Sequence, residues 1–201
     1  MRAVGDVVRG EACLFGGIAL CVVLRPEGLA ANNGMSYYGV HWLTVTPYVG
    51  ALVGAALFIR RGLRGVAAAT PAPEHVRRMA DVFVALLIGI VLTPYTLGGA
   101  VDWAHRGLGA ALFALQLVLG TRLVAWAHGD VLGVAFLLVQ LGGGILAAVF
   151  VLQPDGLLIH GEATFQLGFG LLLVRVLPLV PSRAPVAGPP GREQDVSPAT
   201  T

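Results

Sequence analysis

Six continuous apolar stretches run through the sequence, and they restrict its fold more than any other feature. They cover residues 12–25, 42–59, 79–99, 106–127, 131–152 and 157–178. A helix needs about 20 apolar residues to cross about 30 Å of hydrocarbon, whereas the strands of a membrane barrel alternate apolar with polar residues. A soluble domain of this length could not bury a chain that is 56% hydrophobic and 12% charged. The sequence therefore predicts an all-α fold, a polytopic transmembrane bundle of six helices.

The basic residues lie almost entirely on one side of this predicted bundle. All 13 are arginines, and 11 of them lie on the same side of the bundle. The largest group of these is in the loop between the second and third stretches. Only Arg25 and Arg106 fall on the other side. Because arginine-rich loops stay in the cytoplasm, we expect both the N and the C terminus to be cytoplasmic. The expected location is the cell membrane, as a multi-pass protein of a bacterial plasma membrane.

The two ends of the chain complete the expected organisation. Residues 1–11 are expected to form a cytoplasmic N-terminus, and residues 12–178 the six-helix transmembrane domain. Residues 179–201 are rich in Pro, Gly and small polar residues, which is typical of a disordered cytoplasmic tail. One alternative stays open at the first stretch. Residues 28–30, Gly-Leu-Ala, resemble a signal-peptidase site, and cleavage there would leave five helices in the same orientation.

Polar side chains gather on the side of the predicted bundle opposite to the arginines. The tripeptide Thr-Pro-Tyr occurs at 46–48 and again at 93–95. Two prolines inside membrane helices at one depth would kink both helices and open a space between them. We therefore expect an outward-facing polar vestibule, and its candidate ligand-binding residues are His41, Tyr48, Tyr95, Asp102, His105, His160 and Glu162. Two simpler interpretations compete: the tyrosines belong to an interfacial belt, and Asp102 only stabilises a helix start.

Inside the predicted helices the polar residues are amides. Gln116, Gln140 and Gln166 lie one in each of the last three stretches, where an amide is expected to face a neighbouring helix. With the first stretch beginning at residue 12, no acid or base falls in the middle third of any predicted helix. This absence argues against a proton-coupled transporter or an ion pathway.

The expected function is a non-enzymatic bundle whose vestibule binds a lipid headgroup, a small ligand or a partner protein. The chain contains no P-loop, GxSxG or HExxH motif, so no catalytic residue and no cofactor are predicted. Besides the lipid bilayer and such a ligand, no nucleic-acid partner is expected. One alternative is an outward-facing metal-dependent membrane hydrolase that holds zinc on His41, His105 and His160, with a water in the fourth position. A second alternative is a haem- or quinone-binding membrane protein, because haem needs paired axial histidines.

The first polar loop, "NNGMSYYGVHWLTVTPY", and the stretch "DWAHRGLGAALF" resemble the DUF998 and Frag1/DRAM-like integral membrane proteins. The resemblance covers roughly residues 10–178. It implies a six-helix bundle of mostly unassigned biochemistry, with some members linked to lipid or membrane-trafficking roles. It implies no catalytic residues for this chain.

Overall fold

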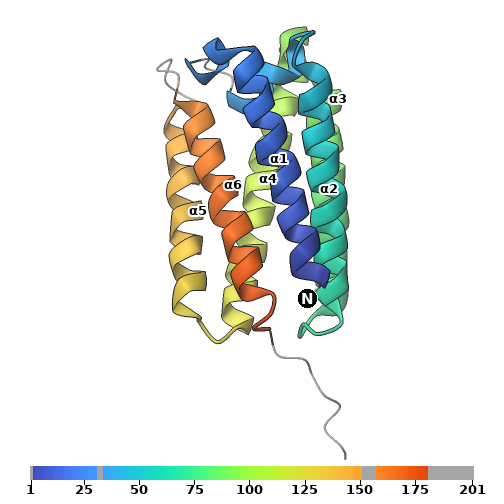
Figure 1. The fold of residues 1–201 in the computed structure, drawn as a ribbon, viewed down its shortest axis with the longest axis vertical. Coiled ribbons are helices and arrows are strands. Elements are labelled where there is room, and N and C mark those ends of the chain that lie inside the picture. The colour runs from blue at the N-terminus through green and yellow to red at the C-terminus, as the bar shows by residue number, and fades with distance from the viewer. Residues whose placement is uncertain (1, 31–33, 151–156, 181–201) are drawn as a thin grey trace, which may run out of the picture.

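The computed structural model describes residues 2–30, 34–150 and 157–180, which form an up-and-down bundle of α-helices (Figure 1). In this part of the chain no strand is present, so the predicted all-α fold is confirmed. The α-helices are α1 (Arg2–Leu24), α2 (Val45–Ala67), α3 (Pro73–Leu92), α4 (Gly99–Trp126), α5 (Val131–Phe150) and α6 (Leu158–Val176). Three short 3-10 helices, η1 (Pro26–Ala30), η2 (Gly34–Val40) and η3 (Tyr95–Leu97), lie together at one end, which we name the cap end. The predicted tail from residue 181 onward lies outside the described residues.

The surface of the bundle is apolar while part of its interior is polar, as expected for a protein surrounded by lipid. On α5 the side chain of Leu138 is 62% exposed, whereas the neighbouring Gln140 is fully buried. Three helical segments are long and apolar enough to cross a membrane: Arg2–Leu24, Gly99–Trp126 and Val131–Val149. These helices support the predicted membrane character of the chain.

Helix α1 is longer than the apolar stretch predicted at 12–25, because it begins at Arg2. Its buried stripe, Val7, Gly10, Leu14, Ile18 and Cys21, advances by three or four residues at a time. This helical period continues through the charged residues that made 1–11 look like a separate terminus. As a result Glu11 lies inside a helix of the bundle. The prediction that no acid or base falls in the middle third of any helix was therefore wrong, because Glu11 lies in the middle third of α1.

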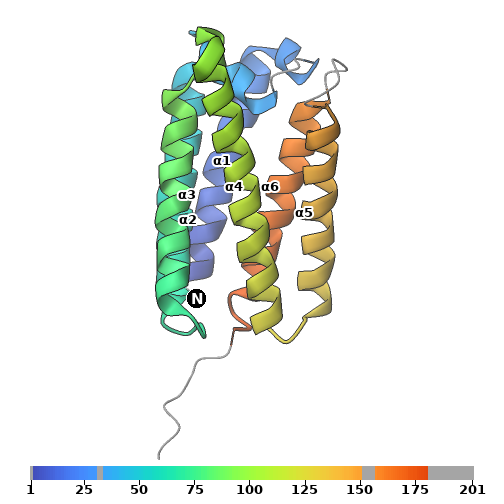
Figure 2. The same cartoon turned by 180° about the vertical axis from the view of Figure 1, so that it is seen from behind.

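Close packing holds the helices in two tight pairs, α1 with α2 and α5 with α6, and Figure 2 shows α4 lying between α3 and the second pair. Glycines allow the approach within each pair. A Cβ at Gly10 would lie 2.9 Å from the side chain of Ile59, and a Cβ at Gly161 would lie 2.8 Å from Cα of Ala147. Small residues at such contacts let helix backbones pack directly against each other.

The two Thr-Pro-Tyr sequences do not kink helix interiors, so that part of the vestibule prediction was wrong. Pro47 lies in the first turn of α2, where its missing N–H has no helical partner to lose. Pro94 follows the end of α3 and precedes η3. Both prolines shape the ends of helices at the cap end.

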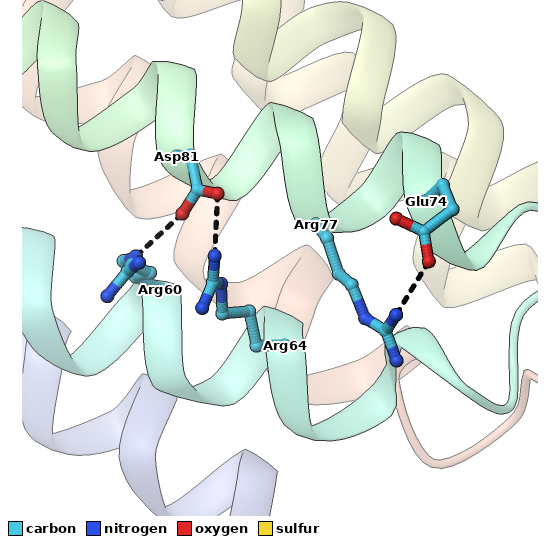
Figure 3. Close-up of polar contacts among 5 residues, drawn as sticks. All are labelled: Arg60, Arg64, Glu74, Arg77 and Asp81. Atoms are coloured by element: carbon cyan, nitrogen blue, oxygen red, sulfur yellow. Dashed lines mark hydrogen bonds and ion pairs between the residues drawn. The ribbon is translucent and has the colours of Figure 1, made fainter.

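Ion pairs link the helices at the opposite end, which carries the N-terminus and which we name the arginine end. Asp81 of α3 lies between Arg60 and Arg64 of α2, at 2.7 and 2.6 Å, and Glu74 pairs with Arg77 on α3 (Figure 3). The two contacts of Asp81 tie α2 to α3, while the Glu74–Arg77 pair lies within α3.

A second link at the arginine end joins the connection between α4 and α5 to α6. Asp130 accepts two hydrogen bonds from Arg175, at 2.7 and 2.9 Å, and one from the backbone N–H of Gly133. The Arg175 guanidinium, helped by the Gly133 N–H, lowers the pKa of Asp130 to about 2. The pair therefore favours the ionised carboxylate in the folded state.

We expect Asp130→Asn to lower the melting temperature Tm at neutral pH, and this deficit to disappear in acid. The folded pKa of Asp130, about 2, lies below the usual aspartate value of about 3.9. Its contribution to stability is thus fully present above about pH 4 and is lost as the pH falls towards about 2. The Tm values of the wild type and the variant, measured in one detergent, should converge over that range. A gap that stays constant would contradict this origin of the stability.

Candidate functional site

A small pocket at the cap end gathers several of the predicted site residues. It has a volume of about 100 Å³ and lies among η2, α2, the end of α3 and the start of α4. Four of its lining side chains are polar: Ser36, Tyr48, Tyr95 and His105. The rest of its lining is apolar or glycine: Gly39, Val40, Val45, Val49, Ile90, Val91 and Pro94. We name this the cap pocket.

The helix η2 forms one wall of the cap pocket, and buried contacts fix its position. Thr44, which is fully buried, donates a hydrogen bond from Oγ1 to the carbonyl of Tyr38 at 2.8 Å. The ring of Tyr38 is also fully buried and lies against Gly28, where a Cβ would come within 2.6 Å of the ring. The segment before α2 is therefore anchored to the bundle at both of its faces.

His105 lines the cap pocket, and only one of its two ring nitrogens is hydrogen-bonded among the described residues. Its Nε2 lies 2.8 Å from Oγ of Ser36, and the ring of Tyr95 meets it edge-on at 6.1 Å between centroids. Its Nδ1 is buried and has no hydrogen-bond partner within the described ranges. A buried nitrogen without a hydrogen-bond partner is energetically costly.

Ser36 connects His105 to a second polar side chain. The hydroxyl of Tyr48, a residue only 4% exposed, is hydrogen-bonded to Ser36. The ring of Tyr48 packs on Gly39, where a Cβ would lie 2.7 Å away. Ser36 was not among the residues predicted from the sequence, because a serine in a polar loop carries no pattern that distinguishes it from its neighbours.

Glu162 contacts the same 3-10 helix from another direction and does not line the cap pocket. Its carboxylate accepts a hydrogen bond from the backbone N–H of Met35 at 2.6 Å. It fits against Gly34, whose φ of +57° lies in the left-handed region. Glu162 thus joins α6 to η2, which is a role in positioning the wall of the pocket.

The other predicted site residues are engaged elsewhere. His41 bonds through Nδ1 to the carbonyl of Tyr37 at 2.7 Å, and its ring lies tilted against the Tyr37 ring. Asp102 pairs with Arg106, one turn along α4, at 3.0 Å, and not with His105. His160 is exposed at the start of α6.

The three histidines that the zinc alternative requires thus contact different groups. Over residues 2–30, 34–150 and 157–180, no three His, Cys, Asp or Glu side chains are arranged so that they could hold a metal ion. The arrangement offers hydrogen bonds to a small polar group and no assembled metal centre among these residues.

Ser36 and His105 also resemble the first two members of a nucleophile–base pair. Such a pair needs a third group that orients the ring through Nδ1. That nitrogen has no partner in the described part of the chain, and no carboxylate is among the lining residues described for the cap pocket. The orienting group of such a pair is therefore not among the lining residues described for the cap pocket.

Comparison of the chain with family models, with curated proteins and with solved structures found no match.

Proposed function

We propose that this chain is a multi-pass protein of the cell membrane whose cap pocket binds a lipid headgroup or a similar small polar ligand without chemical conversion. Six helices would cross the membrane, with the cap end outside and both termini in the cytoplasm. Two observations support this orientation. The N-terminus and the end of α6 lie at the same end of the bundle (Figure 1), and arginines such as Arg60 and Arg64 gather there. A bacterial plasma membrane is the proposed location.

The observation that carries the binding proposal is the buried Nδ1 of His105. A polar atom that has lost water and gained no partner is expected where a ligand supplies the bond. Ser36 and Tyr48 lie beside it, so one small group can meet several hydrogen-bonding side chains. Pockets of this composition, mostly apolar with a few convergent polar groups, are typical of ligand sites.

A lipid is favoured over a free polar molecule because the cap pocket adjoins an apolar groove. Val91 lines both the pocket and a groove of about 170 Å³ between α2 and α3. The lining of the groove is entirely apolar: Leu52, Val53, Ala56, Leu57, Val84, Leu87, Ile88, Val91 and Leu92. A headgroup in the pocket would leave its acyl chain beside this surface.

The test compares two histidines at the same end of the bundle. In His105→Gln the amide nitrogen reaches the position of Nε2 and keeps the Ser36 contact. The variant has no nitrogen at the position of Nδ1, so the hydrogen bond proposed between this atom and the ligand is lost. Loss of one ligand hydrogen bond of about 1.4 kcal/mol corresponds to about tenfold weaker binding. Native mass spectrometry should record that loss for phospholipids added to the purified protein. The exposed His160→Gln should bind as the wild type does, and equal binding by all three proteins would refute the proposal.

A further inference from the structure

A second group of polar side chains lies deep inside the bundle and has no part in the cap pocket. Glu11 of α1 accepts a hydrogen bond at Oε1 from Nε2 of Gln166 on α6, at 2.9 Å. Gln166 accepts one in turn from Nε2 of Gln116 on α4, also at 2.9 Å. Gln140 of α5 packs against Gly120 of α4 and Gly168 of α6 without a hydrogen bond to the other three polar side chains among the described residues. We name the four polar residues the interior polar cluster, which draws one side chain from each of four helices.

The cluster lies far from either end of the bundle. Glu11 follows Arg2 by nine residues, which places it roughly 14 Å along α1 from the arginine end. Gln116 is 1% exposed and Gln140 is fully buried, whereas Glu11 and Gln166 are half-buried. The Oε2 atom of Glu11 is itself buried.

Glycines make room for the polar side chains. A Cβ at Gly170 would lie 2.5 Å from Cδ of Glu11, so only glycine at this position leaves space for the carboxyl group. Gly168 lies against the backbone of Gln140, where a Cβ would come 2.5 Å from its nitrogen, and Gly120 faces its side-chain oxygen at 3.1 Å. Gly170 and Gly120 thus leave room for the side chains of Glu11 and Gln140, and Gly168 allows α5 and α6 to approach at Gln140.

The cluster is not complete on its own. Glu11 Oε2, Gln116 Oε1 and both polar atoms of the Gln140 amide are buried without a hydrogen-bond partner among the residues described. An amide that only held helices together would satisfy its own oxygen and nitrogen. The unpartnered atoms are three oxygens, one of them on a carboxyl group, and one amide nitrogen, and the oxygens can accept a hydrogen bond or coordinate a cation.

No basic side chain supplies a partner for these oxygens within the described ranges. On α1, Arg9 pairs with Asp6 at 3.3 Å. Three arginines of packed neighbours are also engaged: Arg60 and Arg64 of α2 with Asp81, and Arg175 of α6 with Asp130. Among the described residues, no ion pair involves Glu11. An unpaired carboxylate in the interior of a bundle is energetically costly.

We propose that the interior polar cluster binds one monovalent cation, a proton or a sodium ion, on the carboxyl group of Glu11. Either cation would neutralise the carboxylate, and either would employ oxygens that lack a partner. Carboxylate and amide oxygens are the ligands that hard cations take in proteins. The proposal is independent of the cap pocket and assigns to this chain the intramembrane ionisable group typical of proton relays and ion pathways.

The first test uses the wild-type protein and dicyclohexylcarbodiimide, which reacts with protonated carboxyl groups in apolar surroundings. Mass spectrometry should find the adduct on Glu11, and its yield should fall as the pH rises from about 5 to about 9. If NaCl protects Glu11 and choline chloride does not, the cation is sodium. If neither salt protects it, the cation is a proton. Absence of any adduct on Glu11 over this range would overturn the proposal.

The second test compares Glu11→Gln with Asp6→Asn, which removes a charge from the same helix outside the cluster. A ligand that binds only the folded state raises Tm with its concentration. Sodium or acid should therefore raise the Tm of the wild type and of Asp6→Asn by a few degrees more than that of Glu11→Gln. Equal responses in all three proteins would overturn the proposal, and the first test remains decisive if Glu11→Gln does not fold.

Discussion

Gly143→Ala should lower the free energy of unfolding by about 1–3 kcal/mol, the usual cost of forcing an extra methyl group into a packed contact. The added Cβ would lie 2.7 Å from Cα of Phe165 and 2.8 Å from the carbonyl carbon of Thr164. Both are backbone atoms of α6, so no side-chain rotation can relieve the clash. The helices α5 and α6 would have to separate along their tightest contact, which costs dispersion energy over several turns.

The adjacent glycine provides the control for this prediction. Gly142 has nothing within 4 Å of the position a Cβ would take, and it lies on the same helix. Gly142→Ala should leave stability unchanged or raise it by about 0.5–1 kcal/mol, because alanine restricts the unfolded chain. Tm measured by intrinsic fluorescence in one detergent should fall for Gly143→Ala only. Equal Tm values for the two variants would show that α5 and α6 do not meet at Gly143.

The six α-helices of residues 2–30, 34–150 and 157–180 could be predicted from the sequence because each contains a long apolar stretch. The start of α1 could not be predicted by the same rule. Asp6, Arg9 and Glu11 interrupt the hydropathy, although the buried stripe through Val7 and Gly10 continues the helical period. A period count that tolerated charges would have extended this helix and placed Glu11 inside it.

The sequence indicated how far along the helices the site residues lie, but not the direction in which their side chains point around the helix axes. The position of a residue along a helix follows from counting, and Tyr48, Tyr95 and His105 do line one pocket at the cap end. The direction in which a side chain points depends on how the helix packs. Asp102, three residues before His105, turns to Arg106 instead. For the same reason the role of Ser36 became visible only in three dimensions.

Gly34→Ala should lower the free energy of unfolding by roughly 3 kcal/mol, the largest effect of a single change at the cap end. This value combines two separate penalties. The first is backbone strain, since alanine in the left-handed region costs about 1–2 kcal/mol and Gly34 has a φ of +57°. The second is steric, because a Cβ at this position would come within 2.7 Å of Cδ of Glu162. The carboxylate would be displaced from the N–H of Met35, which would then lose its partner.

Gly99 separates these two penalties. Its φ of +53° lies in the same left-handed range, but no atom lies within 4 Å of where its Cβ would be. Gly99→Ala should therefore cost only the strain, about 1–2 kcal/mol, and Gly34→Ala clearly more. The difference between these two costs arises from the contact with Glu162. Combining Glu162→Ala with Gly34→Ala should therefore lower the free energy of unfolding by much less than the sum of the single changes. Unfolding free energies of the two single variants and the double variant would test this coupling. Strict additivity would mean that Glu162 does not hold η2 in place, and that the wall of the cap pocket depends on the backbone of Gly34 alone.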